Sequence, residues 1–138
     1  MTLQRLALGT VVGGLVLFLL GYLVYGVLFA SFFATNVGTA TGVTREPFNF
    51  VALLLGQLAF AAILTMIFSW SAVRSAGQGA KIGALAGLLF FLGIDLTLYA
   101  TTNVQNLAAS LVDALLAALL FAVSGAVSAS VARPKATA

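Results

Sequence analysis

Long apolar stretches separated by short polar segments run through the whole chain. Four such stretches lie at about residues 6–33, 48–73, 82–101 and 108–131. Each is long enough for the ~20 apolar residues that an α-helix needs to cross the hydrocarbon core of a bilayer. The pattern therefore predicts an all-α polytopic membrane protein, a bundle of four transmembrane helices in which consecutive helices are antiparallel neighbours. On this interpretation the 138 residues form a single membrane domain.

The polar segments between these stretches predict the connections. Residues 34–47 are rich in Asn, Gly and Thr and end at Pro47, close to the expected start of the second helix. Residues 74–81 and 102–107 are shorter and predict tight turns. The first connection is therefore the only loop of any length.

The composition agrees with a membrane protein and narrows the possible chemistry. The chain is 62% hydrophobic and 7% charged, with a mean hydropathy of +1.18, whereas soluble domains are roughly 45–50% apolar and about 25% charged. The sequence contains no Cys and no His, which excludes disulfides, thiolate zinc sites and imidazole acid–base chemistry. Nothing in it matches a calcium loop or a catalytic motif. We therefore expect no enzymatic activity, no cofactor and no bound metal.

The basic residues predict an orientation in the membrane. If the chain crosses four times, only Arg45 lies on one side, beside Glu46. The other side then carries five of the six basic residues: Arg5, Arg74, Lys81, Arg133 and Lys135. Because Lys and Arg are enriched in cytoplasmic loops, we expect both termini in the cytoplasm, with the protein in the inner (plasma) membrane. The charges mark helix ends and form no single patch, so the expected partner is the lipid bilayer and not nucleic acid.

Two of the three acidic residues, Asp95 and Asp113, lie inside apolar stretches. An ionisable side chain in the bilayer is costly and normally faces protein or water. At ~1.5 Å per residue, each aspartate lies about 9 Å inside the outer end of its helix. The two therefore share a depth on neighbouring helices. Nothing prevents the two carboxyl groups from approaching each other. If they come within a few ångströms, both cannot ionise comfortably at low dielectric, and one of them should hold a proton.

Other polar side chains complete an expected polar layer in the outer half of the bundle. Tyr25 and Gln57 reach a similar depth from the first and second helices, and Tyr99 lies within one turn of it. Asn106 and Arg45 are expected above the layer. Such a layer suits the binding or conduction of a small ion or proton. Alternatively, Arg45 could fold onto one aspartate as a counter-ion, which would leave little to titrate.

One face of the fourth stretch is small and polar along its whole length. On a helix with about 100° per residue, six residues fall within an arc of roughly 60°: Asn106, Ser110, Asp113, Ala117, Ser124 and Ser128. A stripe of this kind normally faces a bundle interior, a partner helix or a water-filled cavity.

Close helix packing is predicted by a glycine ladder, Gly79, Gly83 and Gly87, with spacing i, i+4, i+8. Small residues at this spacing let two helix backbones approach, either within one bundle or between copies in a homo-oligomer.

Polar side chains in membrane helices also hydrogen-bond across helices, each contributing about 0.6 kcal/mol. A non-transporting accessory or scaffold protein is therefore the alternative to ion or proton binding.

Three segments carry a resemblance to known proteins: GYLVYGVLF at 21–29, GAKIGA at 79–84 and DLTLYAT at 95–101. The chain resembles uncharacterised small bacterial four-span integral membrane proteins, and this resemblance implies four spans in a bacterial inner membrane but no activity. Small multidrug exporters and dual-topology fluoride channels are of comparable length. This chain lacks the carboxylate that the exporters use in their first span, and its charge bias disfavours dual insertion.

Overall fold

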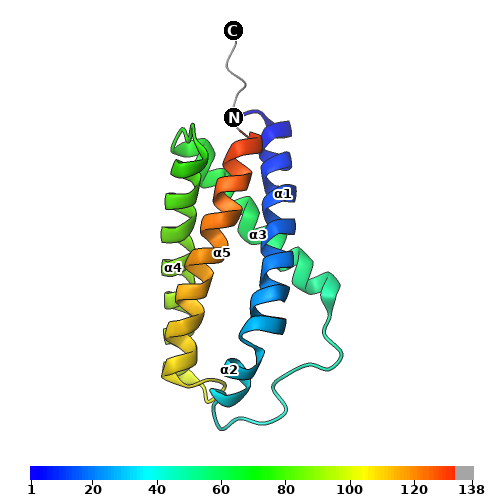
Figure 1. Ribbon diagram of the computed structural model, residues 1–138, viewed down its shortest axis with the longest axis vertical. Helices are drawn as coiled ribbons and strands as arrows, with labels where there is room; N and C mark the ends of the chain where they lie inside the picture. The colour runs from blue at the N-terminus through cyan, green and yellow to red at the C-terminus, as the bar shows by residue number, and fades with distance from the viewer. Residues whose placement is uncertain (133–138) are drawn as a thin grey trace.

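The computed structural model describes residues 1–132 and is built from helices (Figure 1). The elements in chain order are α1 (Leu3–Gly21), the π-helix η1 (Tyr22–Leu28), α2 (Ala30–Thr35), α3 (Phe50–Trp70), α4 (Ala76–Thr101) and α5 (Leu107–Ala132). Four segments are long and apolar enough to cross a membrane: α1 with η1, α3, α4 and α5. The predicted all-α bundle of four membrane-spanning helices is thereby confirmed.

The helix α4 begins six residues earlier than the apolar pattern indicates. Ser75 caps it, because its side-chain oxygen accepts a hydrogen bond from the backbone N–H of Gln78 at 3.1 Å. Gly77 and Gly79, which the sequence pattern placed in the connection before the helix, therefore lie at the start of α4 itself. A side-chain cap satisfies one of the backbone donors left free at a helix start, and this outweighs the weak helix preference of glycine.

The first apolar stretch is not one uniform helix. After Gly21 the backbone widens into η1, where the N–H of Phe29 donates to the carbonyl of Val24, five residues earlier, at 2.7 Å. The chain then continues into the short helix α2. Short π-helical segments are rare and occur often at functional sites, and η1 supplies three residues to the cavity described below: Tyr22, Tyr25 and Gly26.

The helices α4 and α5 form a close antiparallel pair along their whole length. Gly79, Gly83 and Gly87 face the backbone of α5, and a Cβ added at Gly87 would lie 2.6 Å from the carbonyl oxygen of Ala117. The same holds at Gly83, which touches the carbonyl group of Phe121. The glycine ladder is therefore occupied by a contact within one chain and is not available to a second copy.

Polar contacts join α1 to its neighbours at the end of the bundle that holds the N-terminus. The hydroxyl groups of Ser124 and Ser128 on α5 donate to the backbone carbonyls of Gly13 and Gly9, each at 3.0 Å. Thr10 and Thr65 share a hydrogen bond at 2.9 Å between α1 and α3. This half of the polar stripe on α5 therefore serves helix–helix packing.

The two ends of the bundle differ in charge. The start of α1, the end of α5 and the α3–α4 connection share one end, while α2 and the α4–α5 turn lie at the other, here called the α2 end (Figure 1). Arg5, Arg74 and Lys81 belong to elements at the first end, and Arg45 lies in segment 36–49 near the second. The other two basic residues, at 133 and 135, lie outside the described residues.

The helix α3 is inclined, so that its beginning lies away from α4 and α5 (Figure 1). The fully buried core side chains Leu17 and Leu64 lie deeper in the bundle, where α1, α3 and α5 meet. The consequence is an open space at the α2 end, between η1, α5 and the start of α3.

Candidate functional site

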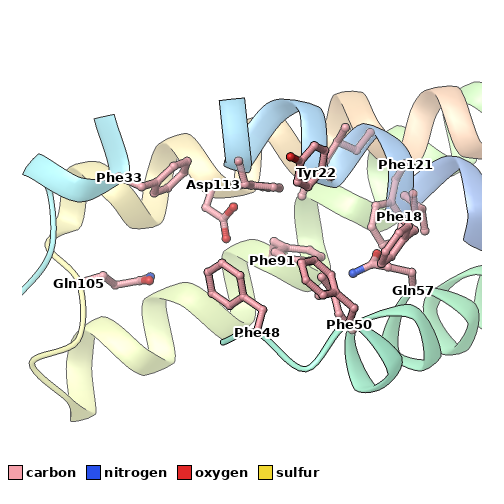
Figure 2. Close-up of a pocket in the computed structure, with 17 residues that line it drawn as sticks. Phe18, Tyr22, Phe33, Phe48, Phe50, Gln57, Phe91, Gln105, Asp113 and Phe121 are labelled. Carbon is pink, nitrogen blue, oxygen red and sulfur yellow. The ribbon is translucent and has the colours of Figure 1, made fainter. Parts of the chain in front are cut away.

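A cavity of about 500 Å³ lies at the α2 end of the bundle. Its walls come from α1, η1, α2, α3, α4 and α5 and from segment 36–49 just before α3. Three of the polar residues singled out in the sequence line it, namely Tyr25, Gln57 and Asp113. Figure 2 shows the Asp113 carboxyl group pointing into this space, and Gln57 placed at the opposite end from Gln105.

Asp113 lies beside both Tyr25 and Asp95. Its carboxyl group interacts electrostatically with the phenol of Tyr25 and with the carboxyl group of Asp95. The contact arises because α4 and α5 are joined by a short turn and pack closely, which brings residues at equal depth face to face. The structure thus brings together the two aspartates and Tyr25.

Asp95 does not line the cavity but is buried beside two residues that do, Asp113 and Gln105, with 3% of its surface exposed. Its Oδ1 atom accepts a hydrogen bond from Nε2 of Gln105 at 3.3 Å, while Oδ2 has no hydrogen-bond partner among the described residues. The hydroxyl oxygen of Tyr25 is buried and unpartnered in the same way. Buried polar atoms are nearly always hydrogen-bonded, and both of these lie beside the Asp113 carboxyl group, so the three side chains form one polar cluster at the cavity.

The charge at this site is not compensated by a basic side chain of the described residues. The groups acting on the two carboxyls are Tyr25, Gln105 and the carboxyls themselves. Arg45 is exposed in segment 36–49 and is not among them. The structure therefore does not place Arg45 as a counter-ion, and the two carboxyl groups are the acidic side chains of the site.

Two further candidate residues, Tyr99 and Asn106, do not line the cavity. Tyr99 is 46% exposed on the outer surface of α4. Asn106 caps α5, since its Oδ1 accepts from the backbone N–H of Ala109 at 2.9 Å, and its Nδ2 donates to Oδ1 of Asn36 at 3.0 Å. Asn106 therefore anchors the segment after α2 to the α4–α5 turn, and its polar atoms are used for this.

Gln105 is the polar site residue that the sequence analysis missed. Its Nε2 donates both to Asp95 and to the hydroxyl of Ser110, the latter at 2.9 Å, and the Ser110 hydroxyl also lies 3.4 Å from the Asp95 carbonyl. A long amide side chain in the turn, five residues before a polar position of α5, was the available signal. Its ability to reach back to α4 follows only from the three-dimensional turn.

The aromatic character of the cavity was also missed. Eight of the 17 lining residues are Phe or Tyr, out of 14 such residues in the chain. They come from seven different segments of the chain, which is why no local pattern reveals them: Phe18, Tyr22, Tyr25, Phe33, Phe48, Phe50, Phe91 and Phe121.

Comparison with models of protein families, with curated proteins and with solved structures found no match for this chain. The resemblance to small bacterial four-span proteins therefore stays a prediction, and the function has to be argued from the geometry of the site.

Proposed function

We propose that this polytopic membrane protein binds a cation at the carboxyl pair of Asp95 and Asp113 and releases a proton in exchange. In the empty site the pair holds one proton, since two neighbouring carboxylates repel each other strongly at low dielectric. A bound cation supplies the positive charge that allows the second carboxyl to ionise. The function is one of binding or transport, and no catalytic step is assigned.

One arrangement carries this proposal: Asp113 points into a cavity, Asp95 is buried beside it, and no basic side chain acts on either carboxyl group. A merely structural aspartate in a membrane helix would be expected to find a donor for each oxygen or a basic partner. The groups that face the pair are Tyr25 from η1 and Gln105 from the turn. Neither carries a positive charge.

The proposed location is the inner (plasma) membrane, with both termini in the cytoplasm. This is supported by the basic residues of α1, of the α3–α4 connection and of early α4, which gather at the end opposite to the cavity. The cavity then lies in the outer half of the bilayer, on the side from which external solutes arrive.

The alternative, an accessory or scaffold protein, is favoured by one part of the structure. The hydrogen bonds from Ser124 and Ser128 to α1 show polar side chains used only to hold helices together. These contacts lie at the far end of the bundle from the cavity. Because these contacts do not involve Asp95 or Asp113, the function of the aspartate pair is tested separately.

The test is proton release from the purified protein in weakly buffered detergent solution, followed with a pH-sensitive dye. Sodium, potassium and tetraphenylphosphonium chlorides are added in turn. We expect about one proton per chain to be released by at least one of these cations. The release should be lost in Asp113→Asn and in Asp95→Asn.

The matched control is Glu46→Gln, which removes the remaining carboxyl side chain at an exposed position outside the cavity. It should release protons as the unmodified protein does. If none of the three cations releases protons from a protein that is folded by circular dichroism, the proposed function is wrong and the scaffold alternative stands.

A further inference from the structure

The walls of the cavity are unsuited to a bare metal ion. Hard cations such as Na⁺ and Ca²⁺ need several oxygen ligands to replace their water, and the described residues contain no group of three or more His, Cys, Asp or Glu that could hold one. The polar side chains that line the cavity are few, and Gln57 lies at the opposite end from Gln105 (Figure 2). The remaining surface is aliphatic or aromatic.

The size of the cavity matches an organic molecule. A volume of about 500 Å³ falls within the roughly 300–1,000 Å³ of typical small-molecule sites. The phenylalanine rings of Phe48, Phe50 and Phe91 lie across the space from the Asp113 carboxyl in Figure 2. Ring faces attract cations by their quadrupole, and this attraction is strongest where water is excluded.

The cavity also reaches the surface of the bundle. Three of its lining residues remain largely exposed, with Tyr22 at 61%, Phe48 at 59% and Phe50 at 50%. Tyr22 lies in η1, Phe48 in segment 36–49 just before α3, and Phe50 at the start of α3; η1 and α3 diverge at the α2 end. An apolar molecule dissolved at the membrane surface therefore has a path into the cavity between these elements.

We infer that the cavity binds a monovalent organic cation with a bulky apolar or aromatic body. The carboxyl group of Asp113 attracts the positive charge of the ligand, and the neighbouring carboxyl group of Asp95 adds to this attraction. The aromatic side chains enclose the apolar body. This inference rests on the proposed function and names the class of ligand for the same site.

The probe is radiolabelled tetraphenylphosphonium, measured by equilibrium dialysis against the purified full-length protein. Tetraphenylborate, which has the same shape and the opposite charge, tests whether charge matters. We expect saturable binding of one tetraphenylphosphonium per chain and an affinity at least about tenfold lower in Asp113→Asn. Tetraphenylborate is dialysed against a separate sample, because the two ions precipitate together, and it should show no saturable binding.

The aromatic contribution is tested at the rim, where substitution leaves the buried packing intact. The double variant Phe48→Leu, Phe50→Leu keeps an apolar rim without ring faces, and we expect it to weaken binding by about three- to tenfold. The control is Phe90→Leu, an exposed phenylalanine of α4 that does not line the cavity. It should leave the affinity unchanged.

The outcomes separate this inference from the proposed function. If sodium or potassium releases protons but tetraphenylphosphonium does not bind, the ligand class is wrong while the cation site stands. If tetraphenylborate binds as tightly as tetraphenylphosphonium, or if Asp113→Asn binds normally, the cavity selects apolar bulk alone and the inference is overturned. Failure of every cation to release protons overturns the proposed function itself.

Discussion

At the scale of single residues, the site depends on how the buried Asp95 carboxyl is held. Its hydrogen-bond donor among the described residues is Gln105, which is itself linked to Ser110 on α5. The sequence alone predicted that Asp95 and Asp113 lie at the same depth on neighbouring helices, because helix rise and a short turn determine this. It left open whether the two carboxyl groups meet. It could not predict Gln105, since the side chain's reach depends on the path of the turn.

Gln105→Ala should therefore destabilise the protein, because it leaves a buried carboxyl oxygen without its donor. We expect a loss of about 1–3 kcal/mol in the free energy of unfolding, measured by denaturant titration in detergent. Gln4→Ala, at an exposed position in the first turn of α1, should change it little. The loss should shrink when Asp95→Asn is also present; equal losses in both backgrounds would show that the two side chains do not interact.

At the scale of elements, the spacing of small residues predicted which face of a helix packs closely, but not which helix packs against it. The ladder of Gly79, Gly83 and Gly87 identified a close-packing face of α4, yet the same spacing fits a partner helix of this chain or of another copy. The structure places α5 there. The π-helix η1 was not predicted at all, because its residues are as apolar as those of a regular helix and the widened turn leaves no compositional mark.

Gly83→Ala should separate α4 from α5, since the added Cβ would collide with the carbonyl group of Phe121. Overpacking of this kind costs about 1–3 kcal/mol, and thermal unfolding in detergent should show it. Gly93→Ala is the control on the same helix, because nothing lies within 4 Å of the added Cβ. It should be neutral or stabilising, given that alanine favours helices over glycine by about 1 kcal/mol. If the two variants unfold alike, the proposed contact does not hold the bundle together.

At the scale of the whole molecule, the four spans and their antiparallel order followed from apolar run lengths and turn signals, and the structure has them. The cavity did not follow, because it arises where the incline of α3 leaves a space that aromatic side chains from distant segments line. The orientation in the membrane depends on the distribution of basic charge and stays a prediction. A chain without cysteine allows it to be tested cleanly.

Single cysteines at Thr41 and Ser71 report on the two sides of the membrane, since they lie in the connections at opposite ends of the bundle. In intact cells, Thr41→Cys should react with a membrane-impermeant maleimide. Ser71→Cys should react only after the membrane is permeabilised. The reverse pattern would invert the proposed topology, and labelling of both in intact cells would indicate dual insertion.

The most direct test uses the fact that Asp95 and Asp113 are the only aspartates in the chain. Protein labelled with ¹³C at the aspartate side-chain carboxyl should give two NMR signals, one for each residue. We predict that tetraphenylphosphonium shifts the Asp113 signal and, through it, the Asp95 signal, at concentrations that leave an Asp113→Asn sample unchanged. Two signals that stay in place as sodium, potassium and tetraphenylphosphonium are each added to saturation would contradict a cation site at the aspartate pair.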